Sequence, residues 1–443
     1  MGKRKEISNW GRYPRIEKKE SLFDNIPVLD GFLSDADTLI ARGMGRCYGD
    51  SSLGDNIINT ASFNRFLAFD DKEGVIECES GVTLDEILQV VVPKGWFIPV
   101  TPGTKFVTVG GAIASDIHGK NHHIDGSFSR HVLSLEIKCS DGTTYHCTPT
   151  DHADLFSATC GGMGLTGMIL SAKIRLKKIA TAYIRQKQLK APSLDKLLEL
   201  FNTYQDYTYS VAWVDCLSKG KSFGRGILML GEHAEEQEVK PGVDKLKVHK
   251  TPKFNIPFDF PSLVLNKLTI RLFNTLYYLK NLRKEQDSVV HYDGFFYPLD
   301  NINNWNRMYG KRGFFQYQFV LPLDKLDLLK EVMLLIAKNN KASFLSVLKV
   351  FGEQDGLLSF PMKGYTLALD IPYDPHLDQF LDQLDLMISE GGGRFYLAKD
   401  ARMKKETFWQ TYQQADKFLE IVNKYNPGSS FSSLQSQRLG ITS

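Results

Sequence analysis

The sequence predicts a mixed α+β fold with two domains, and three observations support this prediction. The chain has 443 residues, of which 42% are hydrophobic, so it can bury a full core and is long for a single domain. Residues 21–178 read as short apolar or β-branched runs separated by Gly-rich turns. Residues 181–393 have fewer glycines and combine alternating aromatic strands with helical periodicity. We therefore expect a Gly-rich domain and a second domain whose sheet is covered on one face.

The first region is expected to be mainly strand, with one clear helix over 83–92 in which apolar residues recur at helical spacing. Its predicted strands are 38–41, 56–59, 74–79, 111–115, 132–140 and 167–176. The second region contributes strands 207–214, 313–321 and 365–371, and helices 324–338 and 377–390. The tail adds a short strand, 394–398, and a helix from about 403 to 425.

The segment between Lys245 and Lys284 is both basic and apolar. It has nine Lys or Arg against a single acid, Asp259. One face of a helix would carry Leu265, Leu268, Leu272, Leu276 and Leu279. A basic helix with an apolar stripe is typical of a surface that meets anionic lipid headgroups or a phosphorylated lipid. An ordinary amphipathic helix packed on the core explains the same pattern, and the sequence leaves both interpretations open.

The composition argues against several classes of protein. A formal net charge of +3 with 24% charged residues gives no basic surface for nucleic acid. The six cysteines include no C-x-x-C pair, so neither a zinc site nor a disulfide framework is predicted. No uncharged apolar run reaches the ~18–20 residues that span a bilayer, and the basic N-terminus lacks the apolar core of a secretion signal. We expect a protein that is cytoplasmic or peripheral on the membrane.

Two Gly-rich segments suit close approach of the backbone to a ligand. Residues 42–50, Arg-Gly-Met-Gly-Arg-Cys-Tyr-Gly-Asp, follow a predicted strand, and their glycines let N–H groups approach an anion. A purely structural turn explains this segment equally well. Residues 160–167 contain G-x-G-x-x-G, but an alternating strand follows instead of the helix that a Rossmann fingerprint opens. We therefore predict no NAD site.

A third segment, 101–123, has an apolar run of small residues between two Gly-containing turns, which can lie flat against a large planar ligand. It contains His118, His122 and His123. Adjacent histidines do not converge easily in an extended chain, and no acid or thiol has ligand spacing, so we predict no metal site. His118 is better placed to hydrogen-bond the edge of a planar ligand or a substrate oxygen.

These three segments, in this order and at these distances, resemble the FAD-binding domain of the vanillyl-alcohol-oxidase superfamily, which has the PCMH-type fold. The run Thr-Val-Gly-Gly-Ala-Ile-Ala-Ser-Asp-Ile-His-Gly-Lys-Asn-His-His over 108–123 is similar to the signature of the decaprenylphosphoryl-ribose oxidase family. Further matching segments are 161–167, 209–213, 305–310, 313–319, 343–352 and 395–402. The resemblance covers nearly the whole chain. It implies an FAD-binding domain of residues 1–180 and 394–443, and a substrate-binding domain of residues 181–393 with an antiparallel sheet covered by helices.

The resemblance also implies the site residues. Those beside FAD are Arg42, Gly43, Met44, Gly45, Arg46, Cys47, Tyr48, Gly49, Gly103, Thr108, Val109, Gly110, Gly111, Ser115, Asp116, Ile117, His118, Ile169 and Tyr396. Those beside the substrate are Lys120, Trp213, Gln316, Gln318, Val347, Lys349, Thr366 and Ala368. The catalytic residues are Lys399, Tyr48 and His118.

Lys399 is the residue with the clearest chemical role. A cation near the flavin N1/C2=O edge or the substrate oxygen stabilises charge that develops only as hydride leaves. Without the resemblance, a lone Lys after a strand would be read as a surface residue. Tyr48 and His118 either remove the hydroxyl proton or orient the hydroxyl, and the sequence leaves open which of them is the base.

Three positions depart from the patterns of related enzymes. Ala368 and Thr366 stand where the family carries Cys and Asn, so nitroaromatic inhibitors that capture this Cys should not react. Cys47 stands where aldonolactone and alditol oxidases carry a His bonded to FAD. We expect non-covalent FAD, with a thioether at Cys47 as the alternative.

The function implied by the resemblance is oxidation of the secondary hydroxyl of a polyprenylphosphoryl-ribose to the 2-keto sugar. This is the first half of epimerisation to the arabinose form for cell-wall arabinan. The implied partners are the lipid-linked sugar, a short-chain NAD(P)-dependent reductase and the membrane, through about 245–284. The alternatives are an aldonolactone or alditol oxidase for a free sugar, which needs no lipid-facing segment, and a non-enzymatic flavin-binding subunit, which would tolerate loss of Lys399.

Overall fold

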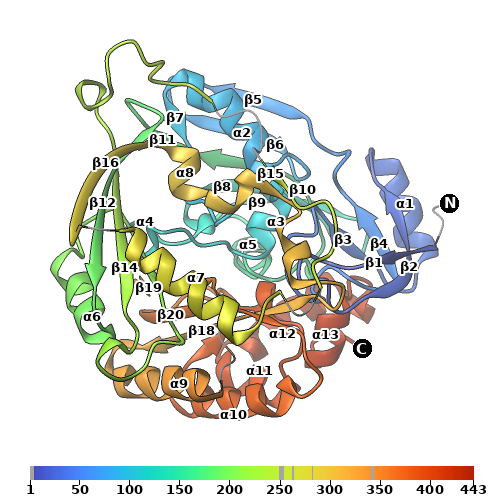
Figure 1. Cartoon of the computed structure of the whole chain (residues 1–443). Coiled ribbons are helices and arrows are strands. Elements are labelled where there is room, and N and C mark those ends of the chain that lie inside the picture. Colours follow the sequence, from blue (N-terminus) through green and yellow to red (C-terminus); the bar gives the residue numbers. More distant parts are fainter. Residues whose placement is uncertain (1–3, 249–253, 262–263, 282, 340, 342–343) are drawn as a thin grey trace.

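Helices and strands are mixed along the whole chain, which confirms the predicted α+β class (Figure 1). The computed structural model describes residues 4–248, 254–261, 264–281, 283–339, 341 and 344–443. The helices are α1 (Ile26–Asp35), α2 (Leu84–Val91), α3 (Val109–Ala114), α4 (His122–Asp125), α5 (Ala153–Thr159), α6 (Leu194–Thr203), α7 (Lys267–Lys280), α8 (Tyr292–Phe296), α9 (Leu326–Asn339), α10 (Leu377–Glu390), α11 (Lys405–Thr411), α12 (Ala415–Tyr425) and α13 (Leu434–Leu439).

Two sheets are built from the first 180 residues. The first has the order β1 (Arg4–Ile7), β2 (Ile16–Leu22), β4 (Asn56–Asn59) and β3 (Ile40–Arg42). The second is antiparallel and has the order β5 (Phe66–Asp70), β6 (Val75–Glu79), β10 (Met168–Arg175), β8 (Val132–Lys138) and β9 (Thr144–Cys147). A short antiparallel pair joins β7 (Trp96–Phe97) to β11 (Lys177–Lys178).

The remaining strands form one large antiparallel sheet and a small parallel pair. In order across the large sheet they are β16 (Glu285–His291), β12 (Tyr183–Ala191), β14 (Gly226–His233), β13 (Tyr209–Val214), β19 (Ser346–Phe351), β20 (Gly364–Pro372), β18 (Phe314–Pro322) and β21 (Arg394–Phe395). The parallel pair is β15 (Phe254–Asn255) with β17 (Ile302–Asn303). The tail strand β21 thus pairs at the edge of the large sheet. The division into domains 1–180 with 394–443 and 181–393 stays a prediction.

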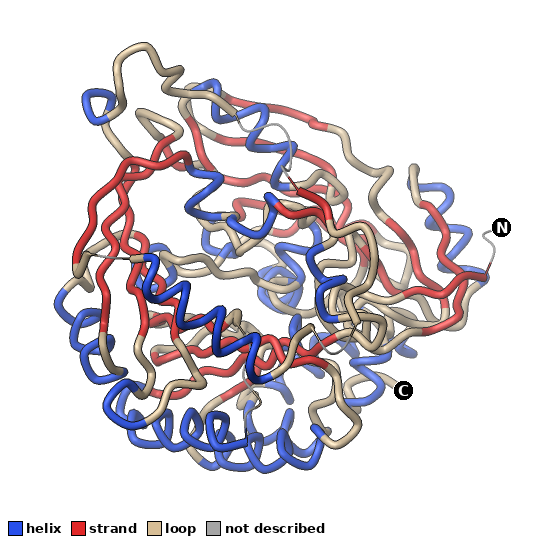
Figure 2. Tube along the Cα trace, viewed as in Figure 1, coloured by secondary structure: helices blue, strands red, loops and turns tan. Residues whose placement is uncertain are grey.

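One face of the large sheet is covered by helices. Helix α6 packs on β12 and β14, and α9 packs on β18 and against α10. Along β18 the side chains alternate, so Tyr317 and Phe319 point to the helical side, where the Tyr317 hydroxyl donates to Asp385 Oδ1 of α10 at 2.7 Å. Figure 2 shows these helices along the lower border of the view. The even-numbered residues of β18 point to the opposite face, where the site lies.

Three sequence predictions were wrong. Residues 111–115 are not a strand but lie in α3, because the Thr108 side chain caps that helix at Gly111 N (3.2 Å). The predicted helix 403–425 is two helices, α11 and α12. They separate at Tyr412, whose backbone is non-helical and whose hydroxyl donates to Phe395 O at 2.6 Å. The first region also contains α1, α4 and α5 beside the expected α2, with Asn25 capping α1.

Helix α7 decides between the two interpretations of its apolar stripe. Leu268, Leu272, Leu276 and Leu279 are exposed, so the stripe does not pack on the core. Leu265 precedes the helix and packs against a small aromatic cluster. Residues 249–253, 262–263 and 282 of the basic segment lie outside the described residues. Within the described ranges, no helix is long and apolar enough to cross a membrane.

Candidate active site

Helix α3 offers an open surface of small residues. Its buried side consists of Val109, Ala112 and Ile113. Its open side consists of Gly111 and Ala114, followed by the C-cap Ser115, whereas Gly110 lies against Ser80, whose Cβ would be 2.9 Å from a Cβ on Gly110. A Cβ added to Gly103, in the preceding loop, would meet no atom within 4 Å, so free space adjoins this loop as well. These features fit FAD, because a planar ring and a pyrophosphate approach the backbone closely only where side chains are absent or small.

Loop 41–51 lies against the start of α3. A Cβ on Gly43 would come within 2.3 Å of Thr108 Oγ1, so only glycine allows this contact. Arg42 fastens the loop to the N-terminal segment by donating from Nη1 to Asn9 Oδ1 at 3.0 Å. Met44 at the tip is exposed. The two Gly-rich segments that the sequence singled out therefore meet in space.

All predicted substrate residues except Lys120 share one face of the large sheet. Paired residues of antiparallel strands point to the same side, and the pairing is continuous across four strands. One row consists of Gln318, Ala368, Val347 and Trp213. The adjacent rows contain the pairs Gln316–Asp370 and Thr366–Lys349. This face is the one opposite α9 and α10, and it carries most of the polar groups of the site.

His118 connects the sheet face with the segment that follows α3. Its Nε2 lies 3.2 Å from Gln318 Nε2, and its ring centroid lies 5.0 Å from that of Tyr396. Burial, with Lys349 as a smaller cause, holds the pKa of His118 well below its ordinary value, so the ring is neutral at pH 7. Nδ1 is buried and has no partner among the described residues. Such an atom marks a place for a ligand group.

Three lysines influence one another's charge around this face: Lys349 on β19, Lys399 after β21, and Lys120 after α3, whose ammonium donates to Phe295 O of α8. Burial lowers the pKa of Lys120 to about 7 and that of Lys349 to about 8, and Lys349 adds to the shift of Lys120. Burial also lowers the pKa of Lys399, while Asp370 opposes the shift. The Lys399 Nζ lies 3.8 Å from the centroid of the Tyr48 ring. This concentration of positive charge suits an anionic ligand.

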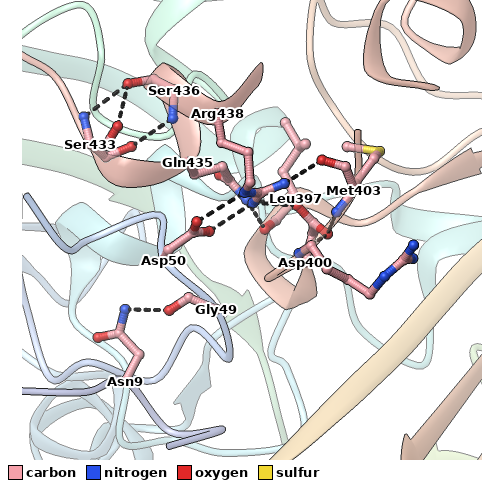
Figure 3. Close-up of polar contacts among 11 residues, drawn as sticks. Asn9, Gly49, Asp50, Leu397, Asp400, Met403, Ser433, Gln435, Ser436 and Arg438 are labelled. Carbon is pink, nitrogen blue, oxygen red and sulfur yellow. Dashed lines mark hydrogen bonds and ion pairs between the residues drawn. The ribbon is translucent and has the colours of Figure 1, made fainter. Parts of the chain in front are cut away.

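The C-terminal helix α13 fixes Tyr48 beside the turn that carries Lys399. Its Arg438 donates to both oxygens of Asp50, at 2.9 and 3.1 Å, and to Asp400 Oδ2 at 2.8 Å (Figure 3). The backbone N–H of Tyr48 donates to Ala398 O at 2.9 Å. One guanidinium therefore bridges the residue that follows Lys399 and the loop that carries Tyr48.

Gly49 is required at this junction. A Cβ there would come within 1.7 Å of Asp400 O, a backbone atom that cannot rotate away. Gln435 of α13 adds a hydrogen bond from Nε2 to Leu397 O at 2.8 Å. The close contact of the two chain segments thus fixes the backbone on either side of Lys399.

Several predicted cofactor positions present backbone, not side chain. The buried side chains among them are those of Val109, Ile117 and Ile169. Asp116 is buried too and accepts hydrogen bonds from Ser127 Oγ at 2.6 Å and from Ser129 N at 2.9 Å. These hydrogen bonds hold the Asp116 carboxylate against its own loop. They therefore give no support to a direct contact between this side chain and FAD. The contacts of all these residues with FAD stay predictions.

Two other predicted cofactor residues have protein neighbours. The Arg46 guanidinium lies 4.0 Å from the centroid of the Trp10 ring. Cys47 Sγ lies 3.2 Å from Ser52 Oγ. Both side chains therefore have defined positions in loop 41–51, close to Tyr48.

Two of the three histidines of segment 101–123 lie on the same aromatic ring. The ring centroids of His118 and His122 lie 4.8 and 4.7 Å from that of Phe351. His122 Nδ1 accepts from Gly352 N at 3.2 Å, whereas His123 Nε2 lies 2.9 Å from Tyr207 O. In the part of the chain that the structure describes, no group of three or more His, Cys, Asp or Glu could hold a metal ion.

Sequence reasoning missed Asp370 and Arg438. Asp370 lies two residues after Ala368 on the same face of β20, so the period of two along a strand was a usable signal. Arg438 gave no signal, because its carboxylate partners lie 38 and 388 residues away in the chain.

Comparisons with known proteins agree with this geometry. Residues 34–148, which include loop 41–51 and α3, match the family model of an FAD binding domain. Decaprenylphosphoryl-β-D-ribose oxidase of Mycolicibacterium smegmatis is 37% identical over 98% of this chain and 97% of that protein. An uncharacterised protein in the mprA 5′ region of Streptomyces coelicolor is 32% identical over 81% of this chain and 100% of that protein. Human Delta(24)-sterol reductase is 27% identical over 39% of this chain and 33% of that protein. The chain therefore belongs to the decaprenylphosphoryl-β-D-ribose oxidase family of FAD-dependent oxidoreductases.

Proposed function

We propose that this protein oxidises the secondary hydroxyl of a polyprenylphosphoryl-ribose to the 2-keto sugar, the first half of epimerisation to the arabinose form. The M. smegmatis relative is named for oxidation of such a lipid-linked ribose. The observation that carries the proposal is Lys349 on the polar face of the large sheet, with Lys120 and Lys399 near enough for its charge to lower their pKa. A sugar phosphate needs cations for its phosphate and hydrogen-bonding groups for its hydroxyls.

The division of work among the residues follows from their positions. Bound FAD would accept the hydride from the carbon that carries the hydroxyl. Lys399 stabilises the negative charge that develops during this transfer, because its ammonium is held over the Tyr48 ring. Gln318, which also donates to Thr366 Oγ1 at 3.3 Å, orients the sugar hydroxyls together with the neighbouring polar residues of its row. Lys349 of β19 and Lys120, whose backbone carbonyl accepts from Ser210 N of β13, bind the phosphate.

The proton of the hydroxyl goes to His118 in this proposal. Burial raises the pKa of Tyr48 well above its ordinary value, so Tyr48 keeps its proton and donates a hydrogen bond to the substrate oxygen. The His118 ring is neutral and can accept a proton. Nδ1 can accept this proton only in the tautomer that carries its own proton on Nε2. This tautomer requires the Gln318 amide to turn, so that its oxygen and not its nitrogen faces Nε2–H across the 3.2 Å contact.

FAD is held without a covalent bond in this proposal. Cys47 occupies a defined position beside Ser52, and the free backbone of α3 offers ample non-covalent contact. Precipitation with acid tests this directly, since it releases non-covalent FAD into the supernatant. Retention of the yellow colour in the pellet would indicate a thioether at Cys47.

Helix α7 is the proposed membrane contact. It carries a stripe of exposed leucines together with exposed Lys267 and Lys280. Its opposite side faces the substrate row, since the Tyr277 ring centroid lies 4.8 Å from that of Trp213 and Asn274 Nδ2 donates to Asp215 Oδ1 at 2.9 Å. In Figure 1, α7 crosses in front of the large sheet. A prenyl chain could therefore pass directly from bilayer to pocket, and the protein would be peripheral on the membrane.

A short-chain NAD(P)-dependent reductase is the proposed partner, because a 2-keto sugar needs a hydride donor to become the epimer. Trapping with borodeuteride tests the oxidised position. Product formed from the lipid-linked ribose should carry deuterium at C2 after reduction, in both ribose and arabinose. Deuterium at another carbon contradicts the proposal, and turnover of free lactones or alditols alone would favour the soluble-sugar alternative.

A further inference from the structure

Asp370 lies on the polar face of the large sheet, and the proposed chemistry gives it no role. It is completely buried in β20. Gln316 Nε2 donates to its Oδ1 at 2.6 Å, and the Tyr309 hydroxyl donates to its Oδ2 at 3.3 Å. Tyr309 ends the 3-10 turn η6 (Trp305–Tyr309), so the carboxylate joins this turn to β18. A buried carboxylate held by two donors has a fixed position, from which its charge acts on neighbouring cations.

The groups around Lys399 show what Asp370 compensates. Burial is the largest cause that lowers the pKa of Lys399, and Lys349 on β19 lowers it further. Asp370 raises it, and Cys47 in loop 41–51 does so to a smaller extent. His118 faces the same ammonium, and its own pKa is lowered partly by Lys399. Without the carboxylate, the charged form of Lys399 would meet a second cation in a poorly solvated place.

Burial also raises the pKa of Asp370, while the hydrogen bond from Gln316 and the charge of Lys399 oppose that shift. The two groups therefore stabilise each other's charged forms. A chain of contacts also connects them, because Gln316, which donates to Asp370, forms a hydrogen bond with Tyr48, and the Tyr48 ring covers the Lys399 ammonium at 3.8 Å. Asp370 thus influences both side chains that meet at this junction.

We propose that Asp370 is a positioning residue that keeps Lys399 protonated beside the flavin and holds Gln316 in its orientation toward the substrate. This inference rests on the proposed place of Lys399 next to FAD. It adds a residue that acts through Lys399 and Gln316 and does not itself touch the reacting atoms.

The test is the midpoint potential of the bound flavin in the holoenzyme, followed from about pH 5.5 to about pH 9.5. A cation next to the flavin stabilises the reduced form, so the slope of the potential against pH changes where Lys399 loses its proton. This change of slope is called the break. The Lys399→Met variant supplies the profile without this cation. Asp370→Asn keeps the shape of the side chain and removes its charge.

We expect the Asp370→Asn break to lie about one pH unit or more below that of the wild type, since an opposite charge at close range shifts a pKa by about 1–3 units. Asp370→Glu should restore the break. Lys349→Met should move it to higher pH, because a repulsive charge is removed. If Asp370→Asn does not fold, Asp370→Ser also removes the charge and should give the same downward shift.

Asp385→Asn is the matched control. Asp385 is also a buried carboxylate whose pKa burial raises to about 7, but it lies on the helical side of β18, where Tyr317 and Arg402 donate to it. Its replacement should leave the break in place. An unmoved break in Asp370→Asn, with the break lost in Lys399→Met, overturns the inference and leaves the proposed function standing. Identical profiles for the wild type and Lys399→Met contradict the proposed place of Lys399, and with it both proposals.

Discussion

A double substitution on α7 tests whether this helix binds a membrane. Leu272 and Leu276 are 61% and 58% exposed and lie one helical turn apart, so Leu272→Ser with Leu276→Ser removes the centre of the exposed stripe. Exposed positions tolerate such changes with little effect on folding. The variant should therefore remain folded and keep its flavin, while its affinity for a bilayer falls.

The expected loss follows from the exposed surface. Complete burial of a leucine contributes about 1.5–3 kcal/mol, so burying the exposed half of each side chain in lipid contributes about 1 kcal/mol. Two leucines together contribute about 2 kcal/mol, which is about a 30-fold change in the partition coefficient. Binding should also weaken with salt, because Lys267 and Lys280 would interact with anionic headgroups.

Cosedimentation with phosphatidylglycerol-containing vesicles measures this partition coefficient. The matched control is Leu334→Ser with Leu386→Ser, since these leucines are 52% and 57% exposed on α9 and α10. The control pair should bind vesicles as the wild type does. Equal losses in both variants, or no loss in the α7 variant, would refute the assignment of α7 as the membrane contact.

Three further predictions concern the site. Arg438→Ala leaves the carboxylates of Asp50 and Asp400 without their shared partner and should lower the free energy of unfolding by about 3 kcal/mol, measured by denaturant unfolding; a change below about 0.5 kcal/mol would contradict the bridging role. The pKa of Lys349 is lowered to about 8 in the folded protein, so above that pH the unfolded chain binds more protons than the folded one. Between about pH 7.5 and about pH 9.5, the free energy of unfolding of the wild type should therefore rise by about 2 kcal/mol relative to that of Lys349→Met. Parallel curves of unfolding free energy against pH would contradict this shift. Cys47→Ser should release the same amount of FAD on acid precipitation as the wild type, and a colour difference between the two pellets would argue for a thioether.

The strands of the large sheet could be predicted because their side chains alternate between two distinct environments. Residues 365–371 show this period, and β20 forms there within a residue at each end. Helix α3 could not be predicted in the same way, since its run of glycine and alanine follows neither the helical nor the strand period. What decides its conformation is the cap at Thr108, a single local hydrogen bond.

The environment of α7 could not be read from its sequence. An apolar stripe at helical spacing looks the same whether it packs on a core or faces a lipid, because both surroundings favour the same side chains. The structure excludes the core interpretation by the exposure of Leu268, Leu272, Leu276 and Leu279.

The site itself depends on long-range contacts. Lys399 and Tyr48 are far apart in the chain and meet because Arg438 and Gly49 hold their segments together. Family resemblance could name both residues, but it gave no geometry. Asp370 was not named at all, although its partner Gln316 was. The two residues are 54 positions apart in the chain, and this separation hides their direct pairing across two neighbouring strands.

The most direct test of the proposed function is an anaerobic absorbance titration of the purified holoenzyme with prenylphosphoryl-ribose. Reduction of the flavin bleaches its visible absorption, so each equivalent of substrate that is oxidised is counted without an added electron acceptor. The account predicts stoichiometric bleaching by the lipid-linked ribose and none by free ribose, lactones or alditols. Bleaching by free sugars alone, or no bleaching by the lipid-linked sugar, would contradict it.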